Sequence, residues 1–184
     1  GEAGPTGKTA MSILRRELVA FLDEFLHTRE IRDHSWNGLQ MEGAERVRRV
    51  AFAVDASTDA FRAAAEADAQ FLVVHHGLFW KGQNPSLAGW MKDRTAILLA
   101  REISLYASHL PLDCHPSAGN NARLLRAVGA KMDGEFGWYE GRYIGWRGSL
   151  ARPAPAARVA ESLKKTLGTS TVTDSREAQA RFDL

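Results

Sequence analysis

Histidine and aspartate side chains gather just after two apolar runs of this 184-residue sequence. His75 and His76 follow the run QFLVV, while His109 follows ISLYAS and lies four residues before Asp113, with His115 two residues further on. Neutral imidazole nitrogens and carboxylate oxygens form the ligand set that suits zinc, iron or manganese. The two clusters therefore predict a site for divalent metal ions.

The adjacent histidines favour two ions over one. Neighbouring side chains of an extended strand point to opposite faces, so His75 and His76 are not expected to bind the same ion. At a strand end that turns at Gly77, each imidazole can face its own ion, and two ions roughly 3.5 to 4 Å apart would activate water as a nucleophile. Two alternatives stay open: the histidine pair occurs by chance, or His75, His76 and Asp113 bind a single ion in an amidohydrolase.

Two further residues near these runs admit more than one interpretation. Asp55 ends the run AFAVD, where an aspartate either joins the site or caps the helix that follows. Cys114 lies between Asp113 and His115, so a nucleophilic thiolate is one interpretation. A small packing residue beneath the site is the alternative for Cys114.

Hydrophobic periodicity predicts an α/β fold. Apolar residues recur at helical spacing, with Ser12 as the expected N-cap of the first helix and Ser57 or Thr58 as that of the second. Helices are expected over residues 12–26, 57–69, 93–103, 116–130 and 157–168. Strands are expected over 47–57, 70–74 and 103–109, and the first of these is expected to be buried. Because strands and helices alternate, we expect a mostly parallel or mixed sheet flanked by helices. Ligands of such sheets bind beyond the carboxyl ends of the strands, where the histidines fall.

Composition suggests how the chain is organised. Residues 1–10 are interpreted as a tag or disordered start, and residues 11–133 as an α/β metal-binding unit. From residue 134 the sequence becomes rich in glycine and aromatic residues, which suggests a second α/β half over 134–184 that ends incomplete.

Charge and cysteine content limit the partners and the compartment. The 24 Lys and Arg residues nearly balance the 22 Asp and Glu residues, and they are scattered, so charge does not indicate a nucleic-acid partner. No apolar stretch approaches the ~20 residues that a membrane-spanning helix needs. The single cysteine fits a reducing compartment, so a cytoplasmic location is expected.

Three segments of the sequence carry a family resemblance. The stretches DHSWNGLQMEG, VVHHGLFWKGQNP and LYASHLPLDCHPSAGNNARLL, in this order, span residues 33 to about 125. They resemble the Nif-three-like family, which is also called the dinuclear-metal-centre or YbgI-like family. The resemblance implies a fold of two similar α/β halves that assembles as a hexameric ring.

The resemblance also implies roles for individual residues. His75 and His76 would each bind one of two metal ions, and Asp113 would bind the first ion. His109 would lie close to the ions in an acid–base or supporting role, and His115 is a second candidate for moving protons. Three asparagines would shape the site: Asn37, Asn120 and Asn121.

The activity that the resemblance implies is metal-dependent hydrolysis of a small molecule. Some members of the family are type 2 GTP cyclohydrolases I, so a nucleotide such as GTP is the expected substrate. The family's closing ligands are a C-terminal histidine and a glutamate that bridges both ions, and this sequence shows no counterpart of either. A non-catalytic metal-binding scaffold, or a regulatory protein that binds a partner, is therefore kept as the alternative.

Overall fold

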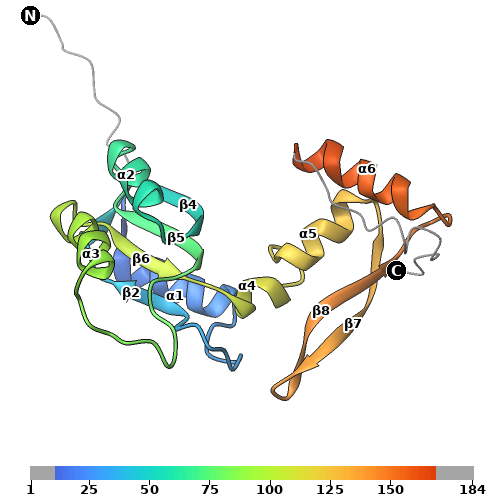
Figure 1. Cartoon of the computed structure of the whole chain (residues 1–184), viewed down its shortest axis with the longest axis horizontal. Coiled ribbons are helices and arrows are strands. Elements are labelled where there is room, and N and C mark those ends of the chain that lie inside the picture. The colour runs from blue at the N-terminus through green and yellow to red at the C-terminus, as the bar shows by residue number, and fades with distance from the viewer. Residues whose placement is uncertain (1–10, 169–184) are drawn as a thin grey trace, which may run out of the picture. The chain divides into compact units, whose positions relative to one another are not determined.

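The computed structural model describes residues 11–168, which are divided between two compact units (Figure 1). The first unit ends at His109 and the second begins at Leu110. The expected tag or disordered start over residues 1–10 lies outside the described residues, as do residues 169–184. The division into compact units thus falls earlier than the change in composition at residue 134, and the domain boundaries inferred from composition stay a prediction.

A four-stranded mixed sheet forms the centre of the first unit, with the strand order β2-β6-β5-β4. Its strands are β2 (Gly38–Met41), β4 (Val50–Asp55), β5 (Phe71–His76) and β6 (Ser104–Ala107). Strands β4, β5 and β6 run parallel, whereas β2 pairs antiparallel with β6. The predicted mostly parallel or mixed sheet is therefore confirmed, and the carboxyl ends of β5 and β6 lie at the same edge.

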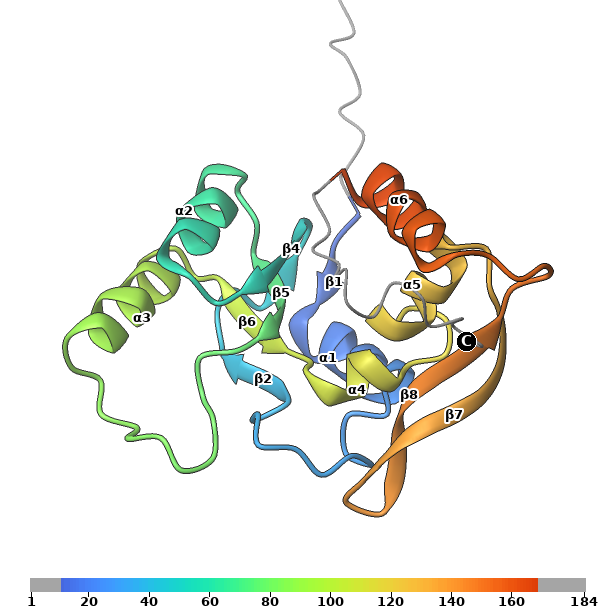
Figure 2. The same cartoon turned by 45° about the vertical axis from the view of Figure 1, so that its right-hand side comes forward.

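Helices cover both faces of this sheet (Figure 2). Helices α2 (Thr58–Glu66) and α3 (Trp90–Ala100) lie side by side on one face, and α1 (Arg15–Phe25) lies on the other. Ser57 caps α2 as expected, because its side chain accepts a hydrogen bond from the Ala60 N–H at 3.1 Å. The core between the sheet and the α2–α3 pair includes Phe61, Leu72, Val74, Leu98, Ile103 and Leu105.

The first helix begins later than the sequence predicted. Ser12 is not its N-cap; Leu14 is. The residues before the helix are drawn into a strand, because β1 (Ile13–Leu14) pairs antiparallel with β3 (Arg46–Val47). This long-range pairing holds Leu14 extended, so the helix cannot start before Arg15.

The strand expected over residues 47–57 was predicted to be buried, and this prediction was wrong. Strand β4 is an edge strand with one neighbour, and its Phe52 and Val54 side chains are 77% and 64% exposed. The apolar run thus looked like a central strand, while only β5 and β6 have neighbours on both sides. Strand β2, inside the DHSWNGLQ segment, was not expected at all.

The second unit combines short helices with a long hairpin. Its elements are α4 (Leu110–Cys114), α5 (Asn120–Ala127), β7 (Lys131–Tyr139), β8 (Arg142–Ser149) and α6 (Ala156–Leu167). Strands β7 and β8 pair antiparallel, and Gly141 adopts φ +94° in the turn between them. A positive φ suits glycine, which has no Cβ to clash. Helix α5 packs on both strands of this hairpin.

The described helices are too short and too polar to cross a bilayer. The longest of them within residues 11–168, α6, has 12 residues, whereas a spanning helix needs about 20. The expected cytoplasmic location stays a prediction.

The buried hydroxyl of Tyr106 makes the stability of the first unit sensitive to high pH. It donates to Asp23 Oδ1 at 2.8 Å and lies 2.8 Å from Thr28 Oγ1. Burial raises the pKa of the Tyr106 phenol well above its ordinary value; the hydrogen bond with Thr28 opposes this shift and the Asp23 carboxylate adds to it.

Alkaline unfolding should therefore depend on Tyr106. A raised pKa in the folded state contributes stability that is present below the ordinary phenol pKa of about 10 and is lost as pH rises above it. We expect the free energy of unfolding to fall by up to about 1.4 kcal/mol per pH unit above pH ~10 in the wild type. In Tyr106→Phe this contribution to the slope should disappear. Urea denaturation of both proteins between pH 8 and 11 measures the difference, and equal slopes would contradict it.

Candidate metal centre

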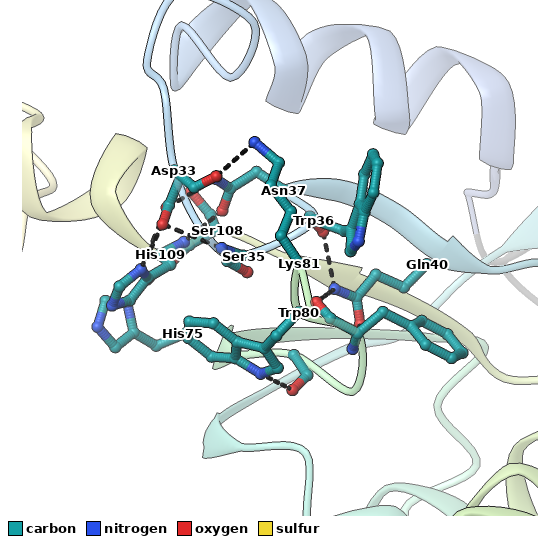
Figure 3. A network of polar contacts seen from close by, with 12 residues as sticks. Asp33, Ser35, Trp36, Asn37, Gln40, His75, Trp80, Lys81, Ser108 and His109 are labelled. Carbon is teal, nitrogen blue, oxygen red and sulfur yellow. Dashed lines mark hydrogen bonds and ion pairs between the residues drawn. The ribbon is translucent and has the colours of Figure 1, made fainter. Parts of the chain in front are cut away.

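Three imidazoles meet at the carboxyl edge of the sheet. His75 and His76 are the last residues of β5, and His109 follows β6, the parallel neighbour of β5. One ring nitrogen from each histidine lies within 4.8 Å of the other two. The ring centroid of His75 lies 4.5 Å from that of His76 and 5.0 Å from that of His109. Figure 3 shows the side chains of His75 and His109 close together.

The arrangement differs from the expectation that adjacent histidines must serve separate ions. Side chains of a regular strand alternate between faces, but His75 and His76 stand at the strand terminus, with their rings tilted by 45°. Both rings therefore reach the neighbourhood of His109. The three nitrogens lie close enough together to bind one shared ion.

Each of the three histidines has its Nδ1 atom next to a hydrogen-bond acceptor. The acceptors are the Ser108 carbonyl for His75 (3.0 Å), Asp55 Oδ1 for His76 (2.7 Å) and the two Asp33 carboxylate oxygens for His109 (3.0 and 3.1 Å). A carbonyl or an ionised carboxylate cannot donate, so each Nδ1 must carry the proton in the neutral ring. The lone pair then lies on Nε2, which is the arrangement that protein metal sites use to orient histidine ligands.

The donor set therefore fits a divalent metal ion of the zinc, iron or manganese type. Three imidazoles whose second nitrogens are held by acceptors are common in such sites. Asp55, for which a helix cap was the alternative, pairs with His76, and Ser57 caps the helix. Asp55 thus supports a candidate ligand.

Residues of the DHSWNGLQ segment hold His109 in place. Asp33 is buried and accepts from the Ser35 N–H at 3.0 Å and from Asn37 Nδ2 at 2.8 Å, in addition to the His109 ring. Asn37 Oδ1 accepts from the backbone N–H of His109 at 2.7 Å. The resemblance assigned Asn37 to shaping the site, and these contacts show how it can do so.

Gln40 of the same segment holds the loop after the histidine pair. Its Oε1 accepts from the Leu78 N–H at 2.7 Å and the Phe79 N–H at 3.3 Å. Its amide lies directly over Gly77, where an added Cβ would also approach Ala107 Cβ to 2.7 Å. Such a contact is too close for any side chain, so a glycine is needed beneath the histidines.

The loop after Gly77 also supplies a wall of the site. The Trp80 ring lies edge-on to His109, with centroids 5.0 Å apart, and its Nε1 donates to the Gly77 carbonyl at 3.0 Å. Phe79, its neighbour in the chain, packs against the hydrophobic core instead. Lys81 Nζ donates to the Asp33 carbonyl at 2.5 Å and so connects this loop to the DHSWNGLQ segment (Figure 3).

The remaining candidates lie in the second unit, which is described by itself. Asp113, in α4, accepts from Asn120 Nδ2 at 2.8 Å through its carboxylate, and its backbone carbonyl accepts from Asn121 Nδ2 at 3.2 Å. The two asparagines thus orient the residue that the resemblance names as a ligand. The ligand role of Asp113 stays a prediction.

His115 and Cys114 are both buried at the end of α4. His115 Nδ1 accepts from the backbone N–H groups of Ser117 and Ala118 at 3.2 and 3.0 Å, and the residue is only 7% exposed. These contacts favour a role in holding the turn before α5, and proton transfer by His115 stays a prediction. The Cys114 thiol is also buried, which favours the packing interpretation over the nucleophilic one.

Sequence reasoning missed the contribution of Asp33, Gln40 and Lys81. Asp33 opens the DHSWNGLQ stretch and Lys81 lies in VVHHGLFWKGQNP, but neither was singled out. Their roles depend on pairing between the two segments, in which Trp36 N–H donates to the Phe79 carbonyl and Lys81 N–H to the His34 carbonyl. The only sequence signal for these three residues was that each is a polar residue inside a segment that resembles a family motif.

Comparison with known proteins shows the family of this chain. Residues 13–182 match the family described as Duf34/NIF3 (NGG1p interacting factor 3). A protein of Archaeoglobus fulgidus named GTP cyclohydrolase 1 type 2 homolog is 50% identical over 147 residues, which cover 80% of this chain and 60% of that protein. A protein of the same name from Pseudomonas aeruginosa is 44% identical over 158 residues, covering 86% and 63%.

Solved structures show the same relationship. Protein ybgI, described as of unknown function, has a TM-score of 0.80 at 36% identity, covering 87% of this chain and 63% of that one. The protein TTHA1606 from Thermus thermophilus has a TM-score of 0.76 at 40% identity, covering 87% and 64%. The chain spans about 60% of the length of these relatives. The fold and the three motifs agree with the match, and this chain belongs to the Duf34/NIF3 family.

Proposed function

We propose that this chain provides the metal-binding site of a metal-dependent hydrolase that acts on a nucleotide such as GTP. The observation that carries the proposal is the convergence of three imidazoles at one sheet edge, each with its Nδ1 held by an acceptor. The nucleotide substrate is suggested by the names of the relatives, which are GTP cyclohydrolase 1 type 2 homologs.

In the proposed reaction, the metal ion and the protein side chains would have different roles. A divalent ion bound here would supply Lewis acidity and would make water a better nucleophile at neutral pH. His109 would keep its Nδ1 proton on the Asp33 carboxylate and present its Nε2 lone pair to the ion. The Trp80 ring contacts His109 edge-on and forms one wall beside it.

A cleft of about 550 Å³ supports a small-molecule substrate. It is lined by residues of α1 and of the DHSWNGLQ segment, among them Asp23, Asp33, Trp36 and Asn37, together with Lys81. Ligand pockets have volumes of ≈ 300 to 1,000 Å³. The cleft shares Asp33 and Asn37 with the network that holds His109, so a ligand there would contact the same residues that support the metal site.

The alternative is a non-catalytic metal-binding scaffold or partner-binding protein. The observation in its favour is a row of aromatic side chains on the β7–β8 hairpin: Phe136, Trp138 and Tyr143 are all more than two-fifths exposed. Exposed aromatics of this kind are enriched at protein interfaces. A homo-oligomer, with the hexameric ring of the family resemblance as its form, is our proposal for what covers them.

Turnover by metal-loaded protein distinguishes the two functions. The purified chain, loaded in turn with Zn²⁺, Mn²⁺ and Fe²⁺, is incubated with GTP and with a panel of other nucleotides, and products are separated by chromatography. We expect GTP consumption that stops on chelation and is absent from His75→Ala. Retained metal with no turnover of any nucleotide would contradict the hydrolase and favour the scaffold.

A further inference from the structure

Asp33 is a buried carboxylate that three donors surround. Its side chain is only 2% exposed, and it accepts from the Ser35 N–H, from Asn37 Nδ2 and from His109 Nδ1. Burying a carboxylate is costly unless hydrogen bonds replace its water. The Ser35 and Asn37 donors hold the carboxylate in one orientation, and its acceptor-only oxygens then require a proton on His109 Nδ1.

The same segment holds His109 at two points. Asn37 must present Nδ2 to Asp33, which only accepts, and Oδ1 to the backbone N–H of His109, which only donates. The amide orientation is therefore fixed by its partners. Lys81 Nζ adds a third contact by donating to the Asp33 carbonyl from the loop that follows the histidine pair.

His76 has a carboxylate partner of a different kind. Asp55 Oδ1 lies 2.7 Å from His76 Nδ1, but the Asp55 side chain is 66% exposed. Water can replace an exposed acceptor, whereas nothing replaces one that is excluded from solvent. Asp33 and Asp55 thus each accept a hydrogen bond from the Nδ1 atom of a clustered histidine, but Asp33 is buried and Asp55 is exposed to solvent.

We propose that Asp33 is a positioning residue that locks His109 in the Nδ1-protonated tautomer, so that the Nε2 lone pair is presented to the metal site. The proposal deepens the proposed function and rests on it for the role of the metal. It assigns the DHSWNGLQ segment, far from His109 in the sequence, to the metal site.

Asparagine at position 33 should reverse the tautomer. An amide has one oxygen and one NH₂ group, so it cannot accept from Ser35, Asn37 and His109 together as the carboxylate does. The Ser35 N–H bonds to one Asp33 oxygen and Asn37 Nδ2 to the other, and His109 Nδ1 lies within 3.1 Å of both. In either orientation the NH₂ group of an asparagine therefore loses one of these donors and faces His109, where it favours an unprotonated Nδ1. In the aspartate–histidine pair of a serine-protease triad, this substitution keeps the geometry and gives the wrong tautomer. The proton then moves to Nε2, where it blocks metal binding.

Nitrogen NMR of the metal-free protein tests directly whether Asp33 fixes the tautomer of His109. Long-range ¹H–¹⁵N spectra, recorded at alkaline pH where imidazoles are neutral, report the tautomer of each ring; His109→Gln assigns the His109 signals. We expect Nδ1–H for His109 in the wild type and in Asp55→Asn, and loss of this form in Asp33→Asn. An Nε2–H form of His109 in the wild type would overturn the proposal, and this result does not depend on whether Asp33→Asn folds. So would an unchanged tautomer in Asp33→Asn with a native amide spectrum.

Cobalt titration then tests the consequence for metal. Second-layer partners of this kind are worth about 10- to 100-fold in metal affinity, so we expect a loss of that size in Asp33→Asn and a smaller loss in Asp55→Asn. Equal losses in the two variants would overturn the special role of the buried aspartate. If the wild type binds no cobalt, the proposed function fails, and the tautomer spectra still decide whether Asp33 positions His109.

Discussion

His75→Ala is expected to lower the affinity of the protein for Zn²⁺ or Co²⁺ by more than about 100-fold. The Ser108 carbonyl fixes His75 as an Nδ1–H tautomer, and its ring centroid lies within 5.0 Å of those of the other two histidines. Removing even an outer partner of a ligand costs about 10- to 100-fold, so removing a ligand itself should cost more. Competition against a chromophoric chelator measures the affinity.

The matched control is His27→Ala, which removes an exposed histidine that lies outside the cluster. Its affinity should equal that of the wild type. Wild-type affinity in His75→Ala, with its circular dichroism unchanged, would show that metal does not bind at this edge of the sheet.

The same titration separates two ligand sets. The observed cluster contains His109, whereas the family resemblance names Asp113 as a ligand and gives His109 a supporting role. A larger loss in His109→Ala than in Asp113→Ala favours three histidine ligands, and the reverse order favours the set implied by the resemblance. The stoichiometry at saturation gives the number of ions.

The second large effect is expected in the core that supports the site. Phe61 of α2 is fully buried among the apolar residues behind β5, the strand that delivers His75 and His76. Truncation of a buried phenylalanine to alanine costs about 3 to 5 kcal/mol, because both burial and packing are lost. We therefore expect Phe61→Ala to lower the free energy of unfolding by this amount in urea denaturation.

Phe52→Ala provides the control for this measurement. Phe52 is 77% exposed on β4, so its truncation removes little buried surface and should change the free energy of unfolding by about 0.5 kcal/mol or less. A loss in Phe52→Ala as large as that in Phe61→Ala would mean that β4 is covered in solution by a surface that the described residues do not include.

Much of the fold could be predicted because local pattern reports it directly. Alternating strands and helices gave the mixed α/β sheet, and Ser57 capped α2 as expected. The histidines could be placed at one sheet edge because parallel strands such as β5 and β6 end on the same side. Edge position and burial were not predictable in the same way, since the apolar run of β4 resembles that of a central strand.

The sequence by itself determined that His75, His76 and His109 follow two apolar strands, and its motifs indicated the family. Only the tertiary structure decided which groups hold their rings. Asp33 and His109 are 76 residues apart, and Asp55 and His76 are 21 apart, so no periodicity links the members of either pair. They meet because strand register and the pairing of two loops bring them within hydrogen-bond distance. The protonated nitrogen of each histidine, and hence its capacity to bind a metal, follows from those long-range contacts.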